Sequence, residues 1–200
     1  MAETTTDTRS EIIEAAREEY FTHGYEGARL QRIADQIGVT KAMIHYYFNT
    51  KKELFEQVYR LSAEEIFRDL GEVLDQDVPL FKKIEQLVDY CLQQATAVPK
   101  VLSFVITESN RQSDWLQPLF EEQLQLDLTQ FEKELKAAAS NYEIASVTAE
   151  TLLLNIFSLC FYPVLAAPVN QSLLKTFASD DTEIPRKGLI LDTILNWLTA

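Results

Sequence analysis

Apolar residues recur at helical spacing along most of the chain, and this pattern predicts an all-α protein. A first helix is expected after a capping-box pattern that begins at Thr8, and Gly24 is expected to stop it. Its apolar stripe comprises Ile12, Ile13, Ala16, Tyr20 and Phe21. A second capping box at Thr50 predicts a long fourth helix, whose inner face carries Leu54, Phe55, Val58 and Leu61.

Two short helices are expected between these two. A second helix over residues 30–37 is predicted by apolar residues at i, i+3, i+4 and i+7, namely Leu30, Ile33, Ala34 and Ile37. Gly38 can adopt the left-handed conformation that ends this helix, and Thr40 is a good N-cap for a third helix through about Tyr47. Helix, tight glycine turn and helix form the helix-turn-helix motif, whose second helix lies in the DNA major groove.

The rest of the chain is interrupted by polar or proline-containing breaks at 76–79, 97–99, 111–114, 140–141 and 179–185. Between them, the pattern predicts an amphipathic helix over 80–91 and one long helix over 115–139. The apolar run 101–106 has the residue types of a buried strand, but its all-helical surroundings favour a helix.

The most hydrophobic stretch, residues 152–167, has three interpretations: a membrane span, a core helix or a subunit interface. It contains Asn155 and Pro163 and is shorter than the ~20 apolar residues that a span needs, so no membrane association is expected. A helix that is apolar almost all round must be buried on all sides. Its own core on one side and a second subunit on the other would achieve this.

Charge is distributed unevenly along the chain. The net charge of −13 is unfavourable for DNA binding, which depends on cations that neutralise phosphates. Residues 1–60, however, hold 8 basic and 10 acidic side chains, whereas residues 61–200 hold 10 basic and 21 acidic ones. From Gly24 to Lys52 there are five basic and two acidic residues. The segment from Gly24 to Lys52 is therefore locally basic, although a few charges more commonly mark a solvated face than a binding site.

Export, metal binding and catalysis find little support. The N-terminus has neither a basic leader nor an apolar core of signal-peptide length, so a cytoplasmic location is expected. Cys91 and Cys160 lie in apolar helical stretches without the spacing of metal ligands, which predicts reduced core thiols and no metal or cofactor. No nucleophile–base pair, glycine-rich phosphate loop or pair of catalytic carboxylates is evident, so no enzymatic activity is expected.

The third predicted helix leaves an unusual set of side chains on its outer face. They are Lys41, Ala42, Met43, His45 and Tyr46. Lys41 can donate to guanine or phosphate, His45 and Tyr46 can form hydrogen bonds, and the methionine can contact a thymine methyl group. The helix N-termini at Arg29 and Lys51 add backbone amides for phosphate oxygens.

The segment GYEGARLQRIADQIGVTKAMIHYYFNTKKELF, Gly24 to Phe55, resembles the DNA-binding head of the TetR (tetracycline-repressor) family of bacterial regulators. The resemblance covers roughly residues 9–60. It implies an all-α homodimer with a flexible N-terminus at 1–8, a three-helix DNA-binding domain at 9–50, and a helical ligand-binding and dimerisation domain at 51–200. The DNA contacts that it implies are Arg29, Thr40, Lys41, Ala42, Met43, His45, Tyr46 and Lys51. Three departures from the family pattern are Ala28, where Thr or Ser is frequent, the order His45-Tyr46, which is usually reversed, and Ala42, where glycine is frequent.

The same resemblance implies three partners: a double-stranded DNA operator, a second copy of the chain, and an unidentified small molecule. The second copy would pair through the helices Leu152–Ala167 and Ile184–Leu198. Candidate pocket residues are Phe104, Glu108, Trp115, Phe131, Asn155, Ser158 and Tyr162. Aromatic residues at helical spacing are nevertheless more often core than pocket.

Three classes of function therefore compete. The leading one is a ligand-responsive DNA-binding transcriptional regulator, which in this family is most often a repressor. The second is a helical interaction protein that keeps the head without binding DNA. The third, an enzyme, lacks a supporting constellation of residues.

Overall fold

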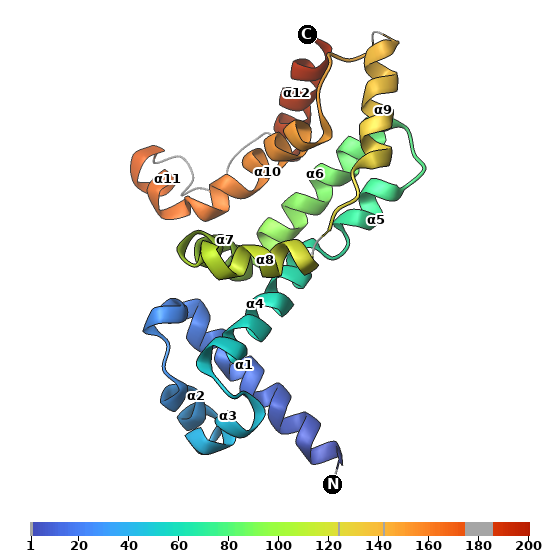
Figure 1. Cartoon of the computed structure of the whole chain (residues 1–200). Coiled ribbons are helices and arrows are strands. Elements are labelled where there is room, and N and C mark those ends of the chain that lie inside the picture. Colours follow the sequence, from blue (N-terminus) through green and yellow to red (C-terminus); the bar gives the residue numbers. More distant parts are fainter. Residues whose placement is uncertain (1, 124, 142, 175–185) are drawn as a thin grey trace. The chain divides into compact units, whose positions relative to one another are not determined.

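The computed structural model describes residues 2–123, 125–141, 143–174 and 186–200, and every regular element in them is an α-helix (Figure 1). The all-α prediction is confirmed. The chain divides into two compact units, residues 1–66 with 100–124 and residues 67–99 with 125–200. This division differs from the expected domains at 9–50 and 51–200. Those bounds of the DNA-binding domain remain a prediction.

The first unit contains six helices in its described residues. They are α1 (Ala2–Gly27), α2 (Leu30–Ile37), α3 (Lys41–Tyr47), most of α4 (Lys51–Phe67), α7 (Pro99–Arg111) and α8 (Ser113–Gln123). The start predicted for the first helix, at the capping box, was wrong because α1 already begins at Ala2. Residues 2–8 contain no glycine or proline, so no helix-breaking residue opposes this earlier start.

Gly24 breaks α1 as expected, although one more helical turn runs on to Gly27. Its backbone has φ 63° and ψ −179°, a region that residues with a Cβ rarely enter. A Cβ at this position would also lie 2.8 Å from Oε1 of Glu108 in α7. The other oxygen of that buried carboxylate accepts a hydrogen bond from the Tyr25 N–H at 3.2 Å. The turn at Gly24 is therefore held by α7.

An aromatic cluster forms the core between α1, α4 and α7. Phe55 of α4 makes edge-on contacts with Tyr20 of α1 and Phe104 of α7, with ring centroids 4.8 Å and 5.6 Å apart. Phe104 also lies 4.7 Å from Phe21 between centroids. The predicted inner face of α4 is buried except for Leu61, which is half-buried. The helix prediction for 101–106 is confirmed by α7.

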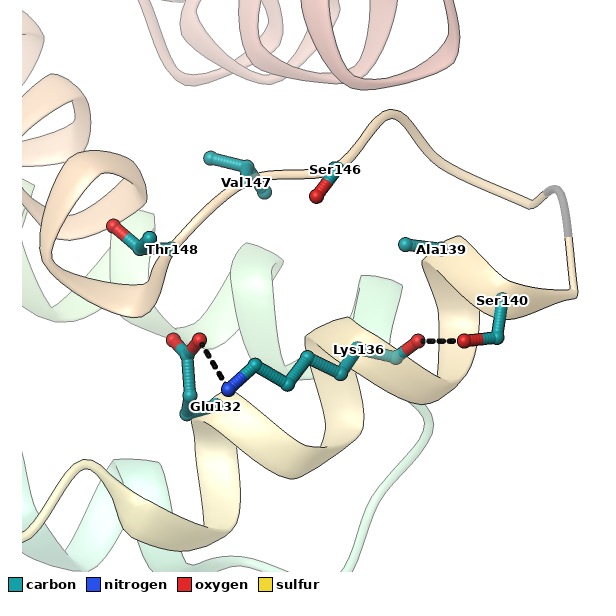
Figure 2. Close-up of a pocket in the computed structure, with 7 residues that line it drawn as sticks. All are labelled: Glu132, Lys136, Ala139, Ser140, Ser146, Val147 and Thr148. Atoms are coloured by element: carbon teal, nitrogen blue, oxygen red, sulfur yellow. Dashed lines mark hydrogen bonds and ion pairs between the residues drawn. The ribbon is translucent and has the colours of Figure 1, made fainter.

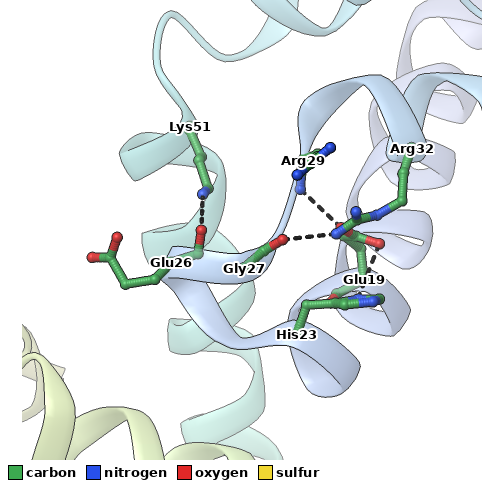
Figure 3. Close-up of polar contacts among 7 residues, drawn as sticks. All are labelled: Glu19, His23, Glu26, Gly27, Arg29, Arg32 and Lys51. Atoms are coloured by element: carbon green, nitrogen blue, oxygen red, sulfur yellow. Dashed lines mark hydrogen bonds and ion pairs between the residues drawn. The ribbon is translucent and has the colours of Figure 1, made fainter.

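One buried carboxylate, Glu19, ties α2 to α1 (Figure 3). Its Oε1 accepts hydrogen bonds from the backbone N–H of Arg29 and from Nε of Arg32, both at 2.8 Å. Arg32 also donates to the carbonyl of Gly27 at 2.7 Å. Arg29 is the N-cap residue of α2 and has no side-chain cap of its own. Glu19 therefore satisfies a helix-end N–H that would otherwise lack a partner.

The second unit contains α5 (Leu70–Asp75), α6 (Leu80–Ala97), α9 (Thr129–Ser140), α10 (Ala149–Leu165), α11 (Ala167–Leu174) and α12 (Arg186–Thr199). Helices α6 and α10 pack closely, and α12 packs against both. The buried residues of these helices include Leu87, Val88, Cys91, Ile156, Cys160 and Ile194. Both cysteines are free and buried, as predicted.

Two helix predictions between residues 115 and 167 need correction. The single helix expected over 115–139 is two helices, α8 and α9, because Asp127 accepts the backbone N–H of Thr129 at 2.9 Å and starts a new helix. The apolar stretch 152–167 is α10 and the start of α11, which meet at a bend of 77°. In the described part of the chain, no single helix is long and apolar enough to cross a membrane, and only this bent pair passes by length and composition.

The last predicted helix, Ile184–Leu198, corresponds to α12, and residues 184 and 185 lie outside the described residues. Lys187 in its first turn bridges to α6, donating to Glu85 at 2.9 Å and to Asp89 at 2.7 Å. Lys83, which is fully buried, pairs with Glu134 of α9 at 2.7 Å. Ion pairs therefore join α6 to α12 and to α9 around the apolar core.

The Glu19→Gln variant should be less stable at pH 7 by about 1–3 kcal/mol, because the charged acceptor of Arg29 and Arg32 is lost. Burial raises the pKa of Glu19, but the hydrogen bonds from Arg32 and Arg29 and the nearby His23 lower it more, so the net shift is below the ordinary 4.5. The stabilisation is therefore complete above pH 4.5 and is lost as the pH falls through the lower pKa of the folded protein. Urea unfolding at several pH values measures this.

Glu18→Gln is the matched control, because Glu18 is the exposed neighbour of Glu19 on α1. It should unfold like the unaltered protein at every pH. Equal stability of the Glu19 and Glu18 variants at pH 7 would contradict the structural role given to Glu19.

Candidate nucleic-acid interface

Helix α3 is anchored on one side and open on the other. Its N-cap Thr40 accepts a hydrogen bond from the Met43 N–H at 3.2 Å, and Ile44 is fully buried. The preceding Gly38 has φ 69° and ψ 26°, the left-handed conformation that the sequence predicted. The N–H groups of Gly38 and Val39 both reach the carbonyl of Ala34, which closes α2 tightly before α3 begins.

Seven of the eight predicted DNA-contact residues are exposed. They are Arg29, Thr40, Lys41, Ala42, Met43, His45 and Tyr46. The exposed fraction is 41% for Met43 and 76% for Tyr46, which is high for side chains of this size and apolar character. The sequence-predicted outer face of α3 is therefore the exposed face in the structure, and Ile44 is the anchor beneath it.

Phe48 and Tyr47 fix the far end of α3. Phe48 is 2% exposed, and the guanidinium of Arg9 lies 5.0 Å from its ring centroid. Tyr47 is half-buried and contacts the exposed Tyr46 edge-on, with ring centroids 5.2 Å apart. The buried Phe48 therefore holds this end of α3 in place.

The eighth predicted contact, Lys51, differs from the others because its ammonium is engaged within the unit. It donates to the carbonyl of Glu26 at 3.4 Å (Figure 3). It also lies 4.8 Å from the centroid of the Tyr25 ring. Partial burial lowers the pKa of Lys51. Its backbone carbonyl accepts the hydroxyl of Tyr20 at 3.1 Å. In this conformation Lys51 joins the first turn of α4 to the end of α1.

The start of α4 has a modified capping box. Thr50 accepts the Glu53 N–H at 3.0 Å, as predicted. The carboxylate of Glu53 accepts the backbone N–H of Asn49 at 3.1 Å, one residue earlier than in the standard motif. His45 also contacts this corner, because its Nδ1 lies 3.3 Å from the carbonyl oxygen of Asn49. The corner therefore fixes one edge of the exposed face of α3.

Sequence reasoning did not find the clamp of Glu19 and Arg32 that holds α2. A signal was present, because an acidic residue occupies position 19 inside the apolar stripe of α1, next to Tyr20. His23 Nδ1 lies 3.3 Å from the same carboxylate. The backbone of Arg29 is fixed by this clamp while its side chain remains exposed.

Three of the seven candidate pocket residues lie in the first unit, and they are bound into its core. Phe104 is 5% exposed and belongs to the aromatic cluster, and Glu108 is committed to Tyr25 and Arg111. Trp115 contacts Tyr25 and Phe55, and the ammonium of Lys52 lies 4.6 Å from its ring centroid. These contacts give the three residues a structural role.

The other four candidates lie in the second unit and differ in burial. Phe131 is buried, Asn155 is half-buried, and Ser158 and Tyr162 are exposed. A cavity of about 540 Å³ in this unit has a different lining, namely Glu132, Lys136, Ala139, Ser140, Ser146, Val147 and Thr148 (Figure 2). In the described residues, no group of three or more His, Cys, Asp or Glu side chains could hold a metal ion. A ligand pocket made of the seven candidates remains a prediction.

The N-terminal region that contains α2 and α3 is also similar in sequence to known proteins. The sequence model of the TetR family of bacterial regulatory proteins matches residues 12–58. The transcriptional repressor SCO4008 of Streptomyces coelicolor is 33% identical over 101 residues, which cover 50% of this chain and 49% of that protein. The repressor AcnR of Corynebacterium glutamicum is 34% identical over 67 residues, 34% of this chain and 36% of that protein. The chain thus spans half or less of the length of these relatives.

The solved structures extend the likeness to the whole fold. The regulator FadR of Bacillus subtilis, crystallised with stearoyl-CoA, aligns with a TM-score of 0.65 over 94% of this chain and 98% of its own, at 19% identity. At this identity the alignment supports the fold alone. Residues 12–58 therefore match the TetR family of bacterial regulatory proteins, and the fold of the chain as a whole is similar to that of a solved regulator.

Proposed function

We propose that the chain is a bacterial transcriptional regulator, a repressor that binds a near-palindromic DNA operator as a dimer in the cytoplasm and responds to a small molecule. The observation that carries this proposal is the exposed face of α3. This face combines a cation, Lys41, with hydrogen-bonding groups and a methionine, and it stands on a buried Ile44. Such a face matches the donors, acceptors and methyl groups of the major groove.

Different side chains would contact the phosphates and the bases of the operator. The exposed side chain of Arg29 and the hydroxyl of Thr40 are suited to phosphate oxygens, which set the register of the protein on DNA. Lys41, Met43, His45 and Tyr46 are suited to base edges. Ala42 adds no bulk, so the backbone of α3 can approach the groove closely.

The dimer is supported by exposed apolar faces on α10 and α12 in the second unit. On α10, Leu154 and Tyr162 are 65% and 57% exposed, two helical turns apart on one face. On α12, Leu189 is 57% and Trp197 is 41% exposed, again eight residues apart. Large exposed apolar surfaces usually mark a partner site. A twofold dimer would carry two heads, one for each half-site of an operator whose half-sites lie about one helical turn of DNA apart.

The proposed regulator responds to a small molecule. This response is supported by the fold shared with the regulator FadR, which was crystallised with stearoyl-CoA. A coupling of about 1–3 kcal/mol between a ligand and DNA would change operator occupancy severalfold or more. The stearoyl-CoA ligand belongs to that protein, and no ligand is assigned to this chain by the likeness.

The alternative is a helical interaction protein that does not bind DNA. The net charge of −13 and the engaged ammonium of Lys51 favour it. Selection of genomic fragments by the purified chain, followed by gel-shift assays, separates the two functions. The regulator should enrich a few fragments with near-palindromic sequences, whereas the interaction protein should enrich none.

On a fragment selected in this way, Arg29→Ala should weaken binding. The slope of log K against log salt concentration should become less negative by about 0.9, because one phosphate contact releases about one counterion. The backbone N–H of residue 29 can still donate to Glu19 in this variant, so α2 should stay in place. Lys133→Ala is the control, because Lys133 is an exposed cation of α9 in the other unit. An Arg29→Ala slope equal to that of the control would remove Arg29 from the contacts.

For the dimer, Tyr162→Arg should yield monomers at micromolar concentration and abolish operator binding. The twofold axis would place two introduced charges, one from each subunit, in the apolar interface. Sedimentation velocity measures the mass, and circular dichroism checks that the variant is folded. Phe161, the adjacent residue, is 5% exposed and stacks on Phe157, so a charge there would disrupt the core instead.

Gln93→Arg, on an exposed position of α6, is the matched control and should remain dimeric. If the unaltered chain sediments as a monomer, or if Tyr162→Arg leaves its mass unchanged, the proposed interface is incorrect.

A further inference from the structure

A second cavity, of about 480 Å³, lies in the first unit and takes no part in the proposed DNA contacts. Its wall consists of the last turns of α1 and one face of α7. The lining residues are Tyr20, Phe21, Thr22, His23, Gly24, Lys100, Ser103, Phe104, Thr107, Glu108 and Arg111. Its volume falls within the range of pockets that hold small molecules.

The α7 side of the cavity is a row of hydrogen-bond donors. Lys100, Ser103, Thr107 and Arg111 recur at i, i+3, i+7 and i+11, which places them along one face of the helix. A cation stands at each end of the row and two hydroxyls stand between them. At 1.5 Å per residue, the row extends about 16 Å along the helix axis.

Several of these donors have no partner within the described residues. The ammonium of Lys100 and the hydroxyls of Thr22, Ser103 and Thr107 make no hydrogen bond or ion pair with any other described residue. Hydroxyls elsewhere in the helices behave differently. Those of Ser62 and Ser109 donate to the carbonyl four residues earlier, at 2.8 Å and 2.6 Å. The cavity therefore collects donors that the fold itself does not use.

The charge of the lining favours an anion. Its single acidic side chain, Glu108, already accepts hydrogen bonds from the Tyr25 N–H and from one nitrogen of Arg111, at 3.2 Å each. His23 directs its Nδ1 towards Glu19, with its carbonyl oxygen at 3.2 Å. Lys100 and the remaining N–H groups of Arg111 are thus available to oxygens of a bound molecule.

We propose that this cavity binds a small organic molecule with an anionic group at each end, of the class of sugar bisphosphates. Lys100 and Arg111 stand at opposite ends of the row, so a molecule with two phosphates can present an anionic group to each of them. The hydroxyls of Thr22, Ser103 and Thr107 then donate to the oxygens between them. The site stands apart from DNA binding, because its lining shares no residue with the exposed face of α3.

Isothermal titration of the full chain with fructose 1,6-bisphosphate, at low ionic strength and without DNA, tests the proposal. Binding should be saturable, should weaken as salt is added, and should be stronger than for fructose 6-phosphate, with no binding of fructose. Lys100→Gln should raise the Kd at least about tenfold, since a charge-assisted hydrogen bond is lost. This variant removes no internal contact, so its fold should be unchanged.

Lys133→Gln, an exposed lysine of α9, is the charge-matched control and should bind as the unaltered chain does. The double variant Ser103→Ala/Thr107→Ala should also weaken binding. Because it leaves the net charge unchanged, such a loss would come from the missing hydroxyl groups. The proposal is overturned if millimolar bisphosphate does not bind, if fructose binds equally well, or if the Lys100 and Lys133 variants bind alike.

Discussion

The carboxylate of Glu19 is the contact on which the geometry of the head depends. It is buried, and it joins the backbone N–H of Arg29 and the guanidinium of Arg32 to α1. Because α2 has no side-chain cap of its own, this contact sets where the helix begins and how it lies on α1. Gly38 and Thr40 then carry that placement over to α3. A buried carboxylate is stable here because two charged or polar donors face it.

The head could be predicted in detail because its signals are local. Gly38, Thr40 and the i, i+3, i+4 pattern of α2 each act within one or two turns, and the structure has them as expected. The outer face of α3 predicted from the sequence is exposed in the structure, and Ile44 is the buried residue beneath it. Glu19 was missed because its role depends on a contact with Arg32, which lies in the next helix, and a periodicity argument does not see such contacts.

The remaining chain was harder to predict because its structure depends on tertiary packing. Apolar periodicity continues across residues 124–128, so it did not reveal the break before α9, where Asp127 accepts the backbone N–H of Thr129. Which side of α10 is buried was also undetermined, since the helix is apolar almost all round. Phe161 lies inward with Phe67 and Phe157, and Leu154 and Tyr162 lie outward. The candidate pocket residues were chosen by residue type alone, and several are structural in the fold.

The central claim is that the exposed face of α3 reads bases in the major groove. Photo-cross-linking tests it most directly: thymines of a selected operator are replaced one at a time by 5-iodouracil, whose iodine occupies the position of the thymine methyl group in that groove. The account predicts adducts within residues 41–46, at Met43, His45 or Tyr46, at symmetric positions of the two half-sites. Adducts confined to other helices, or the absence of any adduct on a tightly bound operator, would contradict it.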